Sequence, residues 1–163
     1  MKIGILSDTH ISDNDKKIPP EVLEGLKGVD MIIHAGDLLD LSVIDTLRSI
    51  CPNIKAVSGN MDGPEIKDKF LQKEIFKVCD YKIGIMHGYG APVNLIELLK
   101  DTFKNDDIDI IIFGHSHTPF NENIDGILFF NPGSPTDKMF APYNSYGIIE
   151  INDKIEAKII KIK

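Results

Sequence analysis

The most constraining feature of this 163-residue chain is a short β-branched apolar run that ends abruptly in glycine and two histidines. The run Ile110 to Phe113 is followed directly by Gly114, His115, Ser116 and His117. An apolar run of this length, stopped by Gly and Pro, is typical of a strand buried on both faces. Imidazoles at the end of such a strand favour a metal site, although a lone His-x-His pair is more often a solvated loop.

The same arrangement recurs along the chain, because other predicted strands also end in polar side chains. These strands cover residues 2–6, 29–34, 54–57 and 81–86. The polar residues at their ends are Asp8, His10, Asp37, Asn60 and His87. Since the carboxyl ends of parallel strands meet at one sheet edge, we expect these side chains to gather with the two histidines described above.

The order of the predicted elements indicates an α/β (α+β) fold. Helices predicted at 21–27, 42–50 and 92–104 are interspersed with strands, and the initial βαβαβ pattern favours parallel strands. The remaining strands are predicted at 73–78, 108–113, 120–124, 127–130, 145–151 and 155–160. We expect one domain over residues 1–163, a four-layer sandwich of two mixed β-sheets packed together and flanked by helices. The metal site is expected at the C-terminal ends of the strands.

The composition of the chain argues against several classes of binding partner. The formal net charge of −7 argues against a surface that follows long nucleic acids. The single arginine, Arg48, falls in a predicted helix, so an arginine clamp on a phosphate is not expected. The sequence has no apolar run long enough for a bilayer, and its first residues enter a strand directly, which predicts a cytoplasmic protein without membrane partners. Cys51 and Cys79 form no Cys-x-x-Cys pattern and are predicted to be buried free thiols.

The number of candidate ligands indicates two metal ions. Seven oxygen and nitrogen donors are more than one ion needs when a water position is left free, and Asp37, alone in its loop, is the natural bridging ligand. Two neighbouring ions can activate a shared water and stabilise the attacking and leaving oxygens of a phosphoryl transfer. Mixed histidine and carboxylate donors suit Mn²⁺ first, with Ni²⁺, Fe²⁺, Zn²⁺ and Co²⁺ as alternatives.

These blocks resemble those of a known family. Asp8-x-His10, Gly36-Asp37, Gly59-Asn60, His87-Gly88 and Gly114-His115-Ser116-His117 are similar to the five blocks of the calcineurin-like binuclear metallophosphoesterases. The small single-domain phosphodiesterases of that superfamily also carry a loop like Asn131 to Ser134. The resemblance implies one ion held by Asp8, His10, Asp37 and His117, and another held by Asp37, Asn60, His87 and His115.

The resemblance also implies an activity, namely hydrolysis of a small or activated phosphodiester by a hydroxide that bridges the two ions. Asn60, Asp37 and His10 are the candidate catalytic residues. In many members a histidine follows the third-block asparagine, whereas this chain has Met61. Methionine cannot protonate a leaving group, so we expect a strong preference for aryl over alkyl diesters. The neighbouring Asp62 could orient a nearby group, but we expect it to be an exposed carboxylate that caps the next turn.

Two other functions stay open at this stage. A phosphomonoesterase or nucleotide hydrolase could use the same centre, but the lack of an arginine clamp favours the diester. A non-catalytic interaction scaffold, like the retromer subunit of this fold, is the other alternative, and the intact ligand positions argue against it. The expected partner is therefore a small-molecule phosphodiester. The sequence leaves the oligomeric state open, including a homo-oligomer.

Overall fold

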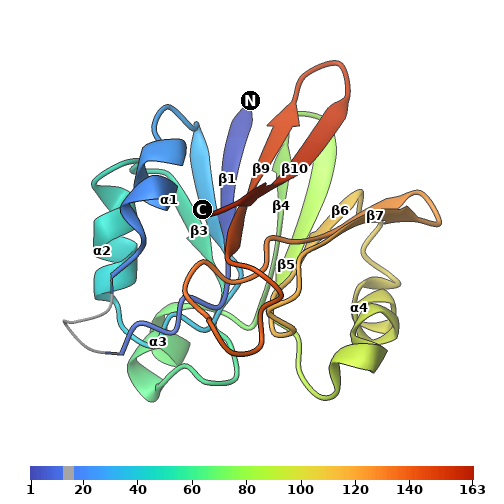
Figure 1. Cartoon of the computed structure of the whole chain (residues 1–163). Coiled ribbons are helices and arrows are strands. Elements are labelled where there is room, and N and C mark those ends of the chain that lie inside the picture. The colour runs from blue at the N-terminus through green and yellow to red at the C-terminus, as the bar shows by residue number, and fades with distance from the viewer. Residues whose placement is uncertain (13–16) are drawn as a thin grey trace.

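The computed structural model describes residues 1–12 and 17–163, and it contains two five-stranded β-sheets that pack against each other (Figure 1). The first sheet has the order β10-β9-β1-β2-β3. Its strands are β1 (Lys2–Leu6), β2 (Met31–His34), β3 (Ile54–Ala56), β9 (Ser145–Ile151) and β10 (Ile155–Lys161). Strands β1, β2 and β3 are parallel, and β9 returns antiparallel to β1 with β10 at its side.

The second sheet has the order β4-β5-β6-β8-β7. Its strands are β4 (Lys73–Val78), β5 (Tyr81–Met86), β6 (Ile110–Ile112), β7 (Phe120–Ile124) and β8 (Ile127–Asn131). Strands β5, β6 and β8 are parallel, whereas β4 and β7 run antiparallel to their neighbours. Each sheet therefore has three parallel strands whose carboxyl ends open into loops.

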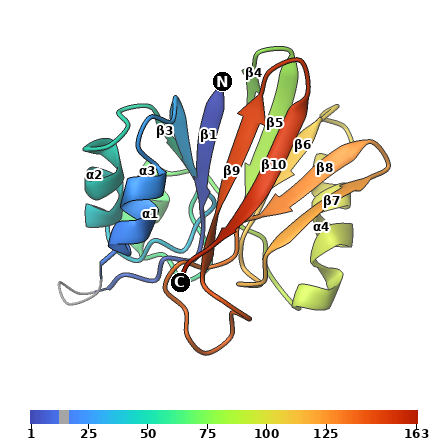
Figure 2. The ribbon, with the colours of Figure 1, turned by 45° about the horizontal axis from the view of Figure 1, so that its top comes forward.

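Helices cover the outer faces of both sheets, so that the molecule has four layers (Figure 2). The helices α1 (Pro20–Gly25) and α2 (Ser42–Arg48) pack on the first sheet, and α4 (Leu95–Phe103), preceded by a 3₁₀ turn (Pro92–Asn94), packs on the second. The two-sheet sandwich predicted from the sequence is confirmed.

The alternation of side chains along each strand builds these layers, because successive residues face opposite sides of a sheet. Ile3 and Ile5 of β1 pack between the sheets against Ile110 and Ile112 of β6. Leu6 faces the helices instead. Strands with apolar residues on both faces are thus buried on both sides, as the isoleucine-rich runs predict.

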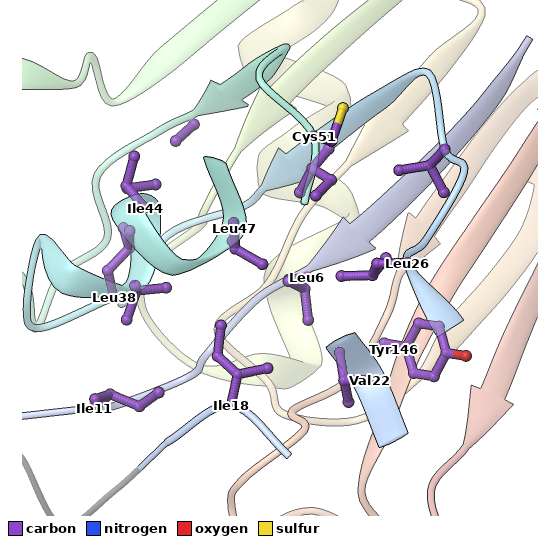
Figure 3. Packing of buried hydrophobic residues seen from close by; sticks show 14 of the residues in the cluster. Leu6, Ile11, Ile18, Val22, Leu26, Leu38, Ile44, Leu47, Cys51 and Tyr146 are labelled. Atoms are coloured by element: carbon purple, nitrogen blue, oxygen red, sulfur yellow. The ribbon is translucent and has the colours of Figure 1, made fainter. Parts of the chain in front are cut away.

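The helical side of the first sheet has its own apolar cluster (Figure 3). In that view Leu6 lies between Val22 and Leu26 of the α1 region on one side and Leu47 of α2 on the other. All four side chains are fully buried. Burial of apolar surface stabilises a fold by about 25 cal/mol per Å². This cluster therefore holds α1 and α2 against β1.

The structure adds one helix to those predicted and corrects the prediction for one cysteine. Helix α3 (Pro64–Lys69) was not predicted, because its six residues contain one buried apolar side chain, Ile66, and so show no amphipathic period. Cys79 was predicted to be buried but is exposed, because it lies in the turn between β4 and β5 with a φ of 53°. Cys51 is a buried free thiol as predicted.

In the described residues, every helix is too short or too polar to cross a bilayer.

Candidate metal centre

The candidate ligands lie in the loops that follow the parallel strands of both sheets, at the lower end of the sandwich in Figure 1. The backbone turns sharply there. Positive φ values occur at Asp8, His10, Asp37, His115 and His117, although L-residues adopt them rarely. Strained backbone conformations persist where the surrounding structure enforces them, and they concentrate at functional sites.

Three of the predicted ligands form a first cluster. The Oδ1 atom of Asp8 lies 3.2 Å from Nε2 of His117 and 3.7 Å from Nε2 of His10. The other carboxylate oxygen of Asp8, Oδ2, accepts hydrogen bonds from the Ser7 hydroxyl at 2.7 Å and from the His115 backbone N–H at 3.1 Å. Asp8 is therefore fixed through one oxygen and presents the other to the histidines.

Asp37 connects this cluster to a second one. Its Oδ2 atom lies 3.5 Å from Nε2 of His10 and 3.2 Å from Nε2 of His87. The donor atoms of Asp8, Asp37 and His87 all lie within 4.8 Å of one another. On the far side of its ring, Nδ1 of His87 lies 2.7 Å from the carbonyl oxygen of Ala35 and donates to it, which leaves Nε2 as a ligand atom.

Three buried polar atoms in these clusters have no hydrogen-bond partner among the described residues: Asp8 Oδ1, His10 Nε2 and His87 Nε2. Buried polar atoms are nearly always paired, so a group of unpaired ones that point toward each other requires an explanation. Carboxylate oxygens and neutral imidazole nitrogens are donors that divalent transition metals accept. The residues at this position therefore fit a metal ion.

The remaining two predicted ligands, Asn60 and His115, lie at the exposed edge of the same site. Nδ1 of His115 is 3.0 Å from Oδ1 of Asn60, and its Nε2 is 2.7 Å from the carbonyl oxygen of Gly90. The rings of His115 and His87 meet edge to face with centroids 5.5 Å apart. All seven predicted ligands therefore lie in one region. Five of them contact one another through their ligand atoms, and Asn60 and His115 form an adjacent pair.

Glycines allow the loops to approach this closely. A Cβ atom at Gly59 would collide with the Asp37 carboxylate, and one at Gly114 would collide with the Ser7 hydroxyl and approach the Asp8 carboxylate at 2.7 Å. These are the glycines of the Gly59-Asn60 and Gly114-His115 blocks. Their role here is to admit a neighbouring carboxylate, which only a residue without a side chain can do.

The structure corrects the prediction for Asp62. This side chain is buried rather than exposed, with 3% of its surface accessible. Its carboxylate accepts hydrogen bonds from the backbone N–H groups of Gly59 at 2.7 Å, Asp37 at 3.0 Å and Leu39 at 2.8 Å. It therefore joins the loops after β2 and β3, and the local turn-forming sequence did not reveal contacts 23 to 25 residues away.

Asp137 supports the site although the sequence did not single it out. Its Oδ2 lies 2.5 Å from Nδ1 of His117, so that Nε2 of the same ring faces Asp8. The arrangement of carboxylate, histidine and ligand site is the one that metal proteins use to orient an imidazole. In the same loop, the buried Ser134 donates to the carbonyl oxygen of Asp8 at 2.7 Å. The Asn131 to Ser134 segment therefore supports the ligand loops.

The electrostatics of the centre favour ionised carboxylates beside positive charge. Burial raises the pKa of Asp8, but the nearby imidazoles of His10 and His117 outweigh burial and hold that pKa well below its usual range. The Asp8 carboxylate, 3.2 Å from Nε2, is the main cause that raises the pKa of His117 to about 9, and Asp137 adds to it. Burial lowers the pKa of His87, but the nearby carboxylates of Asp37 and Asp8 overcome this effect, so the pKa is raised. A metal ion that binds here has to displace these protons.

His34, the fifth histidine, contacts the loops that carry the candidate ligands. It is fully buried, and burial lowers its pKa to about 3, so the ring is neutral. Its Nε2 lies 3.1 Å from the Thr9 hydroxyl, and its Nδ1 accepts the Gly36 N–H at 3.3 Å. These contacts make His34 a supporting residue of the loops after β1 and β2.

Comparison with proteins of known sequence gives close relatives. The chain is 38% identical, over its full length and 82% of the relative, to a probable metallophosphoesterase of Methanocaldococcus jannaschii. It is 33% identical to a phosphodiesterase of the same archaeon, with 82% of this chain and 83% of that protein covered.

Comparison with solved structures gives the same fold. A structure described as a novel archaeal phosphodiesterase has a TM-score of 0.79 and 29% identity, covering 99% of this chain and all of that one. Vps29 from Entamoeba histolytica, solved in complex with zinc, has a TM-score of 0.80 and 25% identity, with 99% of each chain covered. The family model of the calcineurin-like phosphoesterase superfamily domain matches residues 1–154, and the chain belongs to that superfamily.

Proposed function

We propose that this protein is a metal-dependent phosphodiesterase that hydrolyses small or activated phosphodiesters at a centre of two divalent ions. The observation that carries the proposal is the convergence of unpaired buried ligand atoms of Asp8, His10 and His87 around Asp37. Relatives named as phosphodiesterases support the ester class.

The proposed ligands follow the two groups of contacts. One ion would be held by Asp8, His10, Asp37 and His117, and the other by Asp37, Asn60, His87 and His115. Divalent ions held by these residues, with Mn²⁺ as the first candidate, would supply a water of lowered pKa and would polarise the phosphoryl oxygens. Asp37 suits the shared position because its carboxylate lies near His10 on one side and His87 on the other.

The chain itself contributes orientation and charge. The attack of water on phosphorus forms one P–O bond as the bond to the leaving oxygen breaks, and negative charge grows on the phosphoryl oxygens. We assign to the amide N–H of Asn60 a hydrogen bond to one of these oxygens, which strengthens in the transition state. Asn60 is exposed and its Oδ1 faces His115, so its nitrogen is left for the substrate.

Two features favour activated diesters. Met61 is 58% exposed beside the centre and has no proton to give, so the leaving oxygen takes its proton from solvent. The single arginine lies on α2 and pairs with Asp45 at 3.3 Å, in a groove between α2 and α3 rather than at the centre. A monoester would bring a second negative charge that no arginine meets.

The test is hydrolysis of bis(p-nitrophenyl) phosphate by chelator-treated protein before and after Mn²⁺ is returned, with p-nitrophenyl phosphate in parallel. We expect Mn²⁺ to restore diester hydrolysis, Asp37→Asn to abolish it, and Asp153→Asn in an exposed turn to leave it unchanged. Faster hydrolysis of p-nitrophenyl phosphate than of bis(p-nitrophenyl) phosphate would identify a phosphomonoesterase instead.

A second experiment addresses the leaving group. Across a series of aryl methyl phosphates, we expect the rate to fall steeply as the pKa of the leaving phenol rises, and Met61→His to make that dependence shallower. General acid catalysis is worth about 10² to 10⁴, so the gain should be greatest for the poorest leaving group. A flat dependence in the unmodified protein would contradict the assignment.

The non-catalytic scaffold is the second candidate, because Vps29 is among the structural neighbours. It predicts metal binding without turnover of any phosphate ester. Retained Mn²⁺ binding together with no hydrolysis of either p-nitrophenyl ester would make this candidate the better one.

A further inference from the structure

A groove of about 820 Å³ lies beside the metal centre, between the β8–β9 loop and the segment that leads into α1. It begins at His10, one of the proposed ligands, and continues along residues 135–140. In Figure 2 the β8–β9 loop extends below both sheets as the orange-red segment between β8 and β9. The groove is therefore continuous with the centre and extends away from it along this loop.

The groove presents two large apolar side chains to solvent. Met139 is 80% exposed and Phe140 is 72% exposed. The ring of Phe140 meets the ring of His117 edge to face, with centroids 6.3 Å apart. An exposed aromatic side chain in contact with a proposed metal ligand offers a flat apolar surface to whatever group lies next to the reacting phosphate.

Lysines add positive charge to the same groove. Lys17, Lys138 and Lys163 line it, although the chain as a whole carries a formal net charge of −7. Asp137 also lines the groove, but its carboxylate is occupied by His117 and by backbone N–H groups. The groove therefore combines an aromatic surface with cations on an acidic protein.

Hydrogen bonds fix the loop that carries these side chains. The carboxylate of Asp137 accepts the backbone N–H groups of Met139 at 2.8 Å, Phe140 at 3.1 Å and Ala141 at 3.0 Å. The side-chain amide of Asn144 donates to the carbonyl oxygen of Ser134 at 3.2 Å. The aromatic surface is thus held at a set distance from the centre, which lowers the entropy lost when a ligand binds.

We propose that this groove binds the substituent that stays on phosphorus, and that the substituent is a nucleoside bearing a further phosphate. The inference rests on the proposed phosphodiesterase function and names its substrate class. A nucleobase has a π-face that stacks on an aromatic side chain, and every base can do so. An additional phosphate meets the lysines, which bind phosphate as point charges.

Three chromogenic diesters with the same leaving group test the assignment. They are p-nitrophenyl methyl phosphate, thymidine 5′-(p-nitrophenyl phosphate) and its 3′-phosphorylated derivative. Because p-nitrophenolate leaves in every case, differences in kcat/KM report the retained substituent alone. We expect kcat/KM to rise on the order of tenfold from methyl to thymidine, as base stacking predicts, and to rise again with the 3′-phosphate.

Substitutions in the groove test whether it causes this increase in kcat/KM. Phe140→Ala should lower the thymidine-to-methyl ratio on the order of tenfold, and Phe140→Tyr should restore it. Lys138→Gln should lower the gain from the 3′-phosphate severalfold, with a smaller effect at high salt. The matched controls are Val93→Ala, an exposed side chain outside the groove, and Lys154→Gln in the β9–β10 turn, and both ratios should stay unchanged.

A binding experiment provides a readout other than activity. Thymidine 3′,5′-bisphosphate added to metal-free ¹⁵N-labelled protein should shift the amide signals of residues 135–144 in preference to those of α4. Shifts centred elsewhere, or equal kcat/KM for the methyl and thymidine esters, would overturn the assignment and leave the groove as a surface for a protein partner. If none of the three esters is hydrolysed with Mn²⁺ but the bisphosphate still shifts this loop, the proposed function fails and the binding site stands.

Discussion

The two sides of the candidate metal centre are built differently. Asp8, Asp37 and His87 are almost fully buried, with 0%, 2% and 2% of their surfaces accessible. On the other side, Asn60 is exposed and the side-chain contacts of His115 are with Asn60 and a loop carbonyl. The buried side is therefore formed by the core of the sandwich, and the exposed side is formed by loop residues that meet the solvent.

The supporting contacts follow the same division. Asp8 is supported by Ser7 and, through its carbonyl, by Ser134. Asp62 holds the Asp37 loop, and the Ala35 carbonyl orients His87. Preorganised ligands lose less entropy on binding, so we expect the ion proposed for Asp8, His10, Asp37 and His117 to be held more tightly than the ion proposed for the site with Asn60 and His115. The following predictions test that difference, from the largest effect to the smallest.

The largest effect is expected at Asp62. In Asp62→Ala three backbone N–H groups lose a charged acceptor, and at least two of them belong to buried residues, Asp37 and Gly59. Hydrogen bonds to charged groups contribute about 1.5 to 3 kcal/mol each, so the free energy of unfolding should fall by about 4 kcal/mol. Urea unfolding of metal-free protein measures it. Asp68→Ala on the exposed side of α3 is the control, and equal losses in both variants would contradict the role of Asp62.

Asp137→Asn should weaken metal binding without unfolding the protein. The amide can still pair with His117, but it removes the negative charge that raises the ligand's basicity. Mutation of such a carboxylate partner costs about 10- to 100-fold in metal affinity. Isothermal titration with Mn²⁺ should show the loss at the tighter site. If the weaker site changes instead, the assignment of His117 to the same ion as Asp8 is wrong.

His34 should control the pH dependence of stability. Its pKa is about 3 in the folded protein and near 6.5 in the unfolded chain, so the unfolded chain binds more protons between these values. Stability therefore rises with pH across this range, with a contribution of up to about 1.4 kcal/mol per pH unit. In His34→Asn that part of the slope should disappear. Urea unfolding in chelator between pH 4 and 6.5 measures it, and an unchanged slope would show that His34 is already protonated.

The smallest effect on stability is expected for Asn60→Ala. The side chain is exposed, so the free energy of unfolding should change by less than about 0.5 kcal/mol. The number of Mn²⁺ ions bound per chain should nevertheless fall from two to one, and diester hydrolysis should fall with it. If both ions are retained, Asn60 acts on the substrate alone.

Much of the fold and the site could be predicted from local sequence. The isoleucine-rich runs predict strands within a few residues, because burial on both faces leaves a continuous apolar pattern. The candidate ligands follow these strands directly, so the sequence alone places Asp8, Asp37 and His87 at one sheet edge. Helix α3 could not, because its single buried residue leaves no period to detect.

Only the tertiary structure decides which residues support the ligands. Asp62 has the sequence context of an exposed turn residue, yet it is buried because the loops after β2 and β3 close over it. Asp137 lies 20 residues from His117, and their contact depends on the path of the whole β8–β9 loop. The sequence by itself therefore determined the strands and the candidate ligands, since each is encoded by a local pattern. The supporting carboxylates and the groove depend on contacts between distant segments, which no local pattern records.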